Sequence, residues 1–359
     1  MGEFQVHCRD LPAQEGSSDV RDRARSALEA GNWAVAEDLL RQALAHDPTW
    51  AEGHGKLGVC LARQGNLGEA KRHLLSALRR APDDWDAHHD LGVIYEELGE
   101  YENALSCYKQ VVLTRSNDHE TFTRMARCAE EIGRVRDAKV LYGQAIQLQP
   151  DALAPALALA SLHLAEGDLP SANRVIRAAL VYHPDETSLN YVLGLVLEMQ
   201  GQHRDALPLF RAVVQADDQH EEALFHLGLC ARVAGYGREA ATFFARAINL
   251  NPEYLEAIYQ LGELYRESGQ LQKAVLAFEE YLRRIDQAER RQRNWNQEVD
   301  QTARVPVLNA LGLCQRAAGD DNRARRMWEE SLRLNPSQEE VQCWLDEVRP
   351  SRRTSLTID

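Results

Sequence analysis

Residues 221–254 read EEALFHLGLCARVAGYGREAATFFARAINLNPEY, and this stretch decides the fold because its pattern recurs along the chain. Gly235 and Ala240 stand five residues apart within it, and the same Gly–Ala spacing returns every 34 residues. The glycines of this series are Gly31, Gly65, Gly99, Gly133, Gly167, Gly201, Gly235 and Gly269. A fixed period of this length indicates an array of equivalent structural units.

Each unit is predicted to contain two helices. In residues 85–118, apolar side chains recur every three or four positions on both sides of Gly99, as they do on one face of a helix. Gly99 itself is predicted to end the first helix. A second column holds only small residues, which indicates that the paired helices cross closely there. Its members are Ala24, Gly58, Gly92, Ala126, Ala160, Gly194, Gly228 and Gly262.

The register predicts nine repeats. Eight run in tandem over residues 17–288, and a ninth, marked by Gly312, Gly319 and Ala324, covers residues 305–338. Residues 289–304 are an insertion, predicted to extend the second helix of repeat eight by about four turns, or about 24 Å. Residues 339–349 are predicted to form a capping helix, with Ser337 and Glu340 as a capping box. Residues 1–16 and 350–359 are predicted to be disordered.

This pattern resembles the tetratricopeptide repeat family, through the columns above and the Leu-Gly pairs such as Leu193-Gly194 and Leu227-Gly228. The resemblance implies an all-α solenoid, a right-handed superhelix of helical hairpins with a concave groove lined by the first helices. In such an array each hairpin contacts only its neighbours, so that stability is a sum of repeat and interface contributions.

Composition excludes several classes of protein. The 359 residues carry 41 Lys and Arg against 55 Asp and Glu, a net charge of −14. This charge argues against duplex DNA or an anionic membrane as the main partner. Residues 152–165, the most apolar stretch, are too short to span a bilayer. With no signal sequence and no CxxC pair, the seven cysteines are interpreted as reduced thiols of a cytoplasmic protein.

No catalytic motif or cofactor site is predicted. The sequence has no P-loop, GxSxG or HExxH pattern, and no enzyme activity is expected. His88 and His89 are adjacent and point about 100° apart on a helix, so no metal site is predicted there. One column holds Cys60, Cys128, Cys230 and Cys314, which are interpreted as small packing residues. The arginines beside Trp295 are interpreted as a solvated turn and not as a nucleic-acid site.

By the resemblance, the groove-facing columns change character along the chain. Repeats one to four are charged there, with Arg63, Glu96, Glu97, Arg127 and Glu131 among their residues. Repeats five to eight are apolar, which predicts a trough for an amphipathic helix or an extended peptide of a partner. The predicted partner-binding residues are Leu157, Leu164, Tyr191, Leu195, Met199, Phe225, Leu229, Val233 and Tyr259.

These features predict a non-catalytic scaffold or adaptor that binds a protein or peptide, with no cofactor, no nucleic acid and no membrane insertion. The charged N-terminal repeats are expected to contribute selectivity. Two alternatives remain open at this point. One is a regulatory or recruiting subunit whose catalytic partner is a separate chain. The other is that the apolar trough is filled by this protein's own tail or by a second copy.

Overall fold

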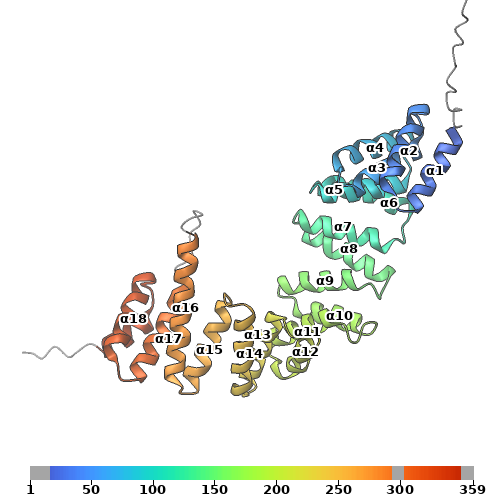
Figure 1. Cartoon of the computed structure of the whole chain (residues 1–359). Coiled ribbons are helices and arrows are strands. Elements are labelled where there is room, and N and C mark those ends of the chain that lie inside the picture. The colour runs from blue at the N-terminus through green and yellow to red at the C-terminus, as the bar shows by residue number, and fades with distance from the viewer. Residues whose placement is uncertain (1–16, 293–302, 349–359) are drawn as a thin grey trace, which may run out of the picture. The chain divides into compact units, whose positions relative to one another are not determined.

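The computed structural model describes residues 17–292 and 303–348 (Figure 1). These residues form nineteen helices and no strand. The first helices of the predicted repeats are α1 (Ser17–Glu29), α3 (Ala51–Arg63), α5 (Trp85–Glu97), α7 (His119–Glu131), α9 (Leu153–Ala165), α11 (Thr187–Met199), α13 (Glu221–Val233), α15 (Leu255–Glu267) and α17 (Arg304–Ala317). The predicted all-α repeat architecture is confirmed.

The second helices alternate with the first. They are α2 (Trp33–His46), α4 (Leu67–Arg80), α6 (Tyr101–Thr114), α8 (Val135–Leu148), α10 (Leu169–Leu180), α12 (His203–Ala216), α14 (Gly237–Leu250), α16 (Leu271–Gln292) and α18 (Asp321–Leu334). A nineteenth helix, α19 (Glu339–Glu347), packs on α18. All bounds lie inside the predicted repeat ranges except the end of α16 and the start of α17.

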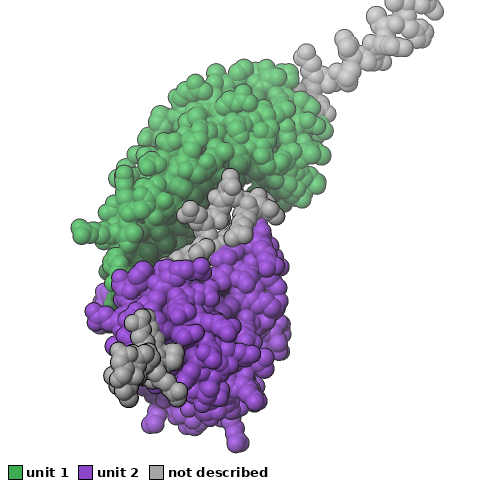
Figure 2. All heavy atoms as spheres, turned by 90° about the vertical axis from the view of Figure 1, so that its left-hand side faces the viewer, with its two compact units in different colours: residues 1–167 green, residues 168–359 purple. Residues whose placement is uncertain are grey.

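The chain divides into two compact units, residues 1–167 and residues 168–359, which Figure 2 shows in green and purple. The boundary falls between α9 and α10, inside the predicted repeat five. Within each unit, consecutive helices pack against one another. Some successive first helices also touch. In unit 1, α3 contacts α5, and in unit 2 each of α11, α13 and α15 contacts the next first helix, up to α17.

The small-residue column marks the close crossings. A Cβ atom added at Gly228 would lie 2.6 Å from Cε1 of Phe244, and one added at Gly312 would lie 2.2 Å from Nε1 of Trp328. Both rings are fully buried. The predicted reason for small residues in this column is therefore confirmed. The same relation, at 16 residues' separation, joins Gly58 with Leu74, Gly92 with Tyr108, Gly194 with Phe210, and Gly262 with Phe278.

The predicted insertion begins as an extension of α16. This helix has 22 residues, whereas the other second helices have 12 to 14. Arg304, at the start of α17, pairs with Glu289 of the extension at 2.9 Å. The Tyr281 hydroxyl donates to the Ala303 carbonyl at 3.3 Å. The rest of the insertion, and the two termini predicted to be disordered, lie outside the described residues.

The predicted capping box at Ser337 is wrong. Helix α19 begins one residue later, and its N-cap is Gln338, whose side chain makes no capping bond. Gln338 instead donates to the carbonyl oxygens of Asn335 and Ser331, at 2.8 and 3.1 Å. The Ser337 N–H donates to Asn335 Oδ1 at 3.2 Å. These bonds hold the turn in a form that keeps Ser337 outside the helix.

Candidate partner-binding groove

In unit 2, the predicted groove residues form one stripe along each first helix. On α13, Glu222, Phe225, Leu229 and Val233 follow at intervals of three and four residues, which places them on one face. The corresponding stripe on α11 is Ser188, Tyr191, Leu195 and Met199. On α15 it is Glu256, Tyr259, Glu263 and Glu267. Because these helices touch in order, the stripes are neighbours.

Exposure differs along the stripes. Met199 is 58% exposed and Val233 is 62% exposed, at equivalent positions of α11 and α13. Tyr191, Leu195, Leu229 and Tyr259 are half-buried. Leu157 and Leu164 are also half-buried, but they lie on α9 in unit 1. The stripes of α11 and α13, together with Tyr259 of α15, therefore offer a partly open apolar surface that is most exposed at the C-terminal ends of α11 and α13.

Phe225 differs from the other predicted residues because its side chain is only 6% exposed. Its ring lies 4.9 Å from that of Tyr254 and 5.9 Å from that of Phe244, measured between centroids. Such aromatic contacts contribute about 0.5–1.5 kcal/mol beyond the area that they bury. Phe225 therefore packs beneath the surface and has little area to offer a partner.

The Tyr191 side chain sits among polar groups as well as apolar ones. Its ring is 4.8 Å from that of His220 and 6.2 Å from that of His226. Burial, followed by the charges of Glu222 and Glu198, raises the pKa of Tyr191 to about 12. The phenol is therefore neutral at physiological pH, and acidic groups surround it.

Polar contacts join the first helices of consecutive repeats beside this surface. His226 Nδ1 lies 2.8 Å from Glu198 Oε2, so that α13 is tied to α11. The His226 ring stacks on the buried Phe210 at 5.5 Å. One repeat later, Arg232 of α13 donates to Gln260 of α15. These contacts hold the first helices in a fixed register.

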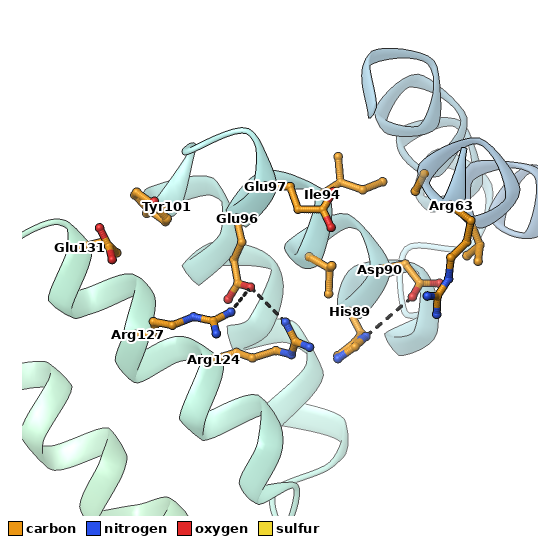
Figure 3. Close-up of a pocket in the computed structure, with 13 residues that line it drawn as sticks. Arg63, His89, Asp90, Ile94, Glu96, Glu97, Tyr101, Arg124, Arg127 and Glu131 are labelled. Carbon is orange, nitrogen blue, oxygen red and sulfur yellow. Dashed lines mark hydrogen bonds and ion pairs between the residues drawn. The ribbon is translucent and has the colours of Figure 1, made fainter. Parts of the chain in front are cut away.

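Unit 1 contains a hollow of about 590 Å³ that α3, α5, α7 and the first residue of α6 line (Figure 3). Its polar lining residues are Arg63, His89, Asp90, Glu96, Glu97, Tyr101, Arg124, Arg127 and Glu131. Several of these were expected at groove-facing columns, but a site was predicted only in repeats five to eight. A mixed-charge lining of this kind suits polar contacts more than the burial of an apolar peptide.

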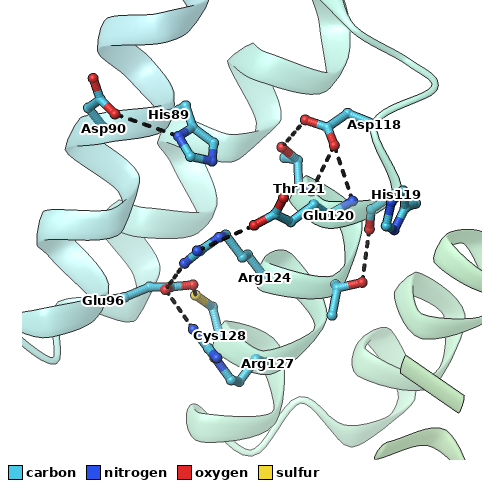
Figure 4. A network of polar contacts seen from close by, with 11 residues as sticks. His89, Asp90, Glu96, Asp118, His119, Glu120, Thr121, Arg124, Arg127 and Cys128 are labelled. Atoms are coloured by element: carbon cyan, nitrogen blue, oxygen red, sulfur yellow. Dashed lines mark hydrogen bonds and ion pairs between the residues drawn. The ribbon is translucent and has the colours of Figure 1, made fainter. Parts of the chain in front are cut away.

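The charges of the hollow are largely paired with one another. Glu96 Oε2 accepts from Arg124 at 3.0 Å and from Arg127 at 2.8 Å, and Glu96 Oε1 accepts from the Cys128 thiol at 3.3 Å (Figure 4). Asp118 caps α7 and thereby fixes the helix that carries both arginines. The signal that would have revealed this network is charge complementarity at a separation of 28 residues, as in Glu96 and Arg124.

The cysteine column behaves as predicted. Cys60, Cys128, Cys230 and Cys314 are all buried, and burial is the main cause that raises their pKa values, to about 11 for Cys60 and Cys314 and about 12 for Cys128 and Cys230. They are packing residues, because a thiol that stays protonated is a poor nucleophile. In the two described ranges, no three His, Cys, Asp or Glu side chains gather in a way that would hold a metal ion.

Comparison with known families agrees with this geometry. Family models described as tetratricopeptide repeat match residues 27–91 and 61–128, residues 157–221 and 200–254, and residues 243–275. The chain belongs to the tetratricopeptide repeat family. As a tetratricopeptide repeat protein, it is built of helical hairpins that stack on their neighbours within each unit. No helix among the described residues is both long and apolar enough to cross a membrane.

Solved structures share the fold. PilW, a widely conserved type IV pilus biogenesis factor, has a TM-score of 0.52 and 20% identity, over 63% of this chain and 98% of PilW. PilF of Pseudomonas aeruginosa has a TM-score of 0.50 and 17% identity, over 65% of this chain and 99% of PilF. YrrB, a repeat protein with an unusual peptide-binding site, has a TM-score of 0.46 and 21% identity, over 49% of this chain and 91% of YrrB. At such identities the likenesses to PilW and PilF show the fold alone. No curated protein matches the sequence.

Proposed function

We propose that this tetratricopeptide repeat protein is a non-catalytic scaffold that holds a segment of a partner protein against the first helices of repeats six to eight, in unit 2. The observation that carries the proposal is the exposure of Met199 and Val233 at equivalent positions of two helices that touch. An exposed apolar side chain repeated across neighbouring helices favours a binding surface over a chance surface residue.

The proposed surface is built in two layers. Tyr191, Leu195, Leu229 and Tyr259 are half-buried and would contact the partner with part of their area. Phe225 supports them from beneath. Desolvation of the exposed apolar side chains by a partner contributes about 1–3 kcal/mol each. Leu157 and Leu164 of α9 are proposed as further contacts within unit 1.

The cell compartment is part of the proposal. We propose a cytoplasmic location, which is supported by the free state of the six cysteines among the described residues. In this proposal the chain acts as an adaptor that brings its bound partner to another protein. A partner that is itself an enzyme would make this chain a recruiting subunit.

The test is a pull-down from a lysate of the native host, with captured proteins identified by mass spectrometry. The variant Met199→Asp/Val233→Asp places two charges on the proposed surface. The matched control is Leu276→Asp, because Leu276 is 66% exposed but lies on the second helix α16. Circular dichroism verifies that all three proteins are folded.

We expect wild type and the control to capture the same partners, and the double variant to lose them. An unchanged partner list for the double variant would place the binding surface elsewhere and overturn the proposal. Loss of partners from both variants would mean that the effect is not specific to the surface.

A further inference from the structure

We infer that the partner segment is amphipathic and carries Lys or Arg side chains along the edge that meets the N-terminal ends of α13 and α15. This inference rests on the proposed function, because it describes the occupant of the same surface. It adds the chemistry by which the surface would select one apolar segment over another.

The stripes of α13 and α15 both begin on an acidic residue. Glu222 and Glu256 occupy the second positions of the two helices. The α13 stripe continues with the apolar residues Phe225, Leu229 and Val233, whereas the α15 stripe continues with Tyr259, Glu263 and Glu267. Glu222 and Val233 are separated by about 16 Å along the helix at 1.5 Å per residue. A segment that covers Val233 with an apolar side chain therefore reaches Glu222 within a few turns of helix or a short extended stretch.

These two carboxylates have no basic partner among Lys and Arg in the described residues. Glu256 accepts a hydrogen bond from the Gln260 amide at 2.9 Å. Glu222 lies 3.2 Å from Nδ1 of His220, the same atom that accepts from the Ala223 N–H to cap α13. The favourable helix dipole explains why carboxylates are tolerated in a first turn, but it leaves their charge open to a partner.

The basic groups of the same helices are already paired. Arg232 forms an ion pair with Glu267 at 2.8 Å, and Arg266 forms one with Glu263 at 2.7 Å. Helices α11, α13 and α15 together carry six Glu and two Arg. These three helices are therefore acidic in balance, and Glu222 and Glu256, which have no Lys or Arg partner among the described residues, lie at the N-terminal ends of α13 and α15. A basic side chain is the complement of such an edge, and an acidic one would be repelled.

Aromatic rings next to these carboxylates strengthen the argument. The Tyr191 ring lies 4.8 Å from that of His220, the residue before α13. The Tyr254 ring lies 4.9 Å from that of Phe225, in the second turn of α13. Burial and the charge of Glu222 raise the pKa of both phenols. An aromatic ring face and a carboxylate both attract positive charge, so that rings beside carboxylates without a Lys or Arg partner favour a cation.

The experiment selects peptides from a random 16-residue display library on the full-length protein. A selected peptide is then titrated, by fluorescence anisotropy, against wild type, Glu222→Gln/Glu256→Gln and Met199→Asp/Val233→Asp. The control is Glu279→Gln, which removes an exposed carboxylate from the second helix α16. Each titration is repeated at low and high NaCl concentration, because salt screens exposed charges.

We expect the selected peptides to combine apolar residues with Lys or Arg. The Gln double variant should bind about tenfold more weakly at low salt, with a smaller difference at high salt, and the control should bind like wild type. Peptides without basic enrichment that still depend on Met199 and Val233 would overturn this inference and leave the proposed function standing.

Two other outcomes also decide the matter. If wild type selects no peptide, both the proposed function and this inference fail. If wild type dimerises by analytical ultracentrifugation and Met199→Asp/Val233→Asp is monomeric, the occupant is a second copy of the chain, and the inference of a basic partner is overturned.

Discussion

Glu96 and Arg124 form an ion pair 3.0 Å long across the boundary between two repeats, and 28 residues separate them in the chain. The same separation joins Glu198 with His226. Both bonds run from the twelfth position of one repeat to the sixth position of the next. At these two boundaries a polar contact at the same place joins the repeats, in addition to their apolar packing.

Removal of the Glu96 charge is expected to destabilise unit 1. Its side chain is 8% exposed, and Glu96→Gln would leave Arg124 without its closest counter-charge. We expect a loss of about 1–3 kcal/mol in the free energy of unfolding, measured by urea denaturation. Arg127 is exposed and adds little to this figure. The control Glu97→Gln, at an exposed position, should change stability by less than about 0.5 kcal/mol. Equal effects of the two variants would contradict the assigned role of Glu96.

The close crossing at Gly312 predicts a strong effect of a single methyl group. In Gly312→Ala the new Cβ would meet the Trp328 ring, which is buried and donates from Nε1 to the Asn309 carbonyl at 3.3 Å. We expect a loss of about 1–3 kcal/mol. Gly237→Ala is the control, since its nearest neighbour would be Leu264 at 3.6 Å, an ordinary contact. Thermal denaturation should show a lower midpoint for the first variant and no loss for the second.

Thiol reactivity should separate the cysteine column from Cys343. Cys343 is exposed, whereas Cys60, Cys128, Cys230 and Cys314 are buried. We expect iodoacetamide to modify Cys343 rapidly in the native protein and the four buried thiols only after denaturation, as read by peptide mass spectrometry. Rapid native modification of Cys128 or Cys230 would show that the repeats open far more often than their burial implies.

Stability should fall in alkaline solution. The unfolded thiols ionise near their ordinary pKa of 9, whereas the folded Cys60 and Cys230 thiols ionise at about 11 and about 12. Between these values the unfolded chain has released protons that the folded chain retains, so that the free energy of unfolding decreases as pH rises above about 9. Urea midpoints measured from pH 8 to pH 10.5 would test this, and a flat profile would contradict it.

Phe225→Ala is expected to reduce the stability of the fold, because Phe225 is a packing residue and not mainly a contact for the partner. The ring is buried against Phe244 and Tyr254, and its removal should lower the free energy of unfolding by about 3–5 kcal/mol. Leu195→Ala, at a half-buried position of the same surface, should cost less. Urea denaturation of both variants decides the order. A stability loss for Phe225→Ala no larger than that for Leu195→Ala would mean that Phe225 is not the support described here.

Much of the fold was predictable because each 34-residue period contains one pair of helices, and the glycine and small-residue columns mark the turn and the crossing of that pair. Gly99 and its equivalents follow the ends of the first helices with positive φ, and the small residue at Gly228 marks a close crossing that the ring of Phe244 fills. The division of the chain between α9 and α10 had no such signal, since the period continues through Gly167 without a break.

The site was predictable only as a set of columns. Phe225 and Val233 belong to the same stripe of α13, yet the first is buried and the second is exposed. The difference arises because the Phe225 ring reaches Phe244 of α14 and Tyr254, the residue before α15, and an assignment to a column does not include such contacts. The hollow of unit 1 depends on side chains such as Glu96 that pair across helices, a relation that lies outside any single repeat.

The bonds at 28 residues' separation also bear on how such a chain can change during evolution. Each bond takes one end from one repeat and the other end from the next, so that no repeat carries a complete pair. A copy of repeat five inserted after repeat three would set Ala158 opposite Glu96 and leave a nearly buried carboxylate without its donor. Duplications and exchanges of repeats are therefore not equivalent, because the repeats that carry these bonds depend on which repeat follows them.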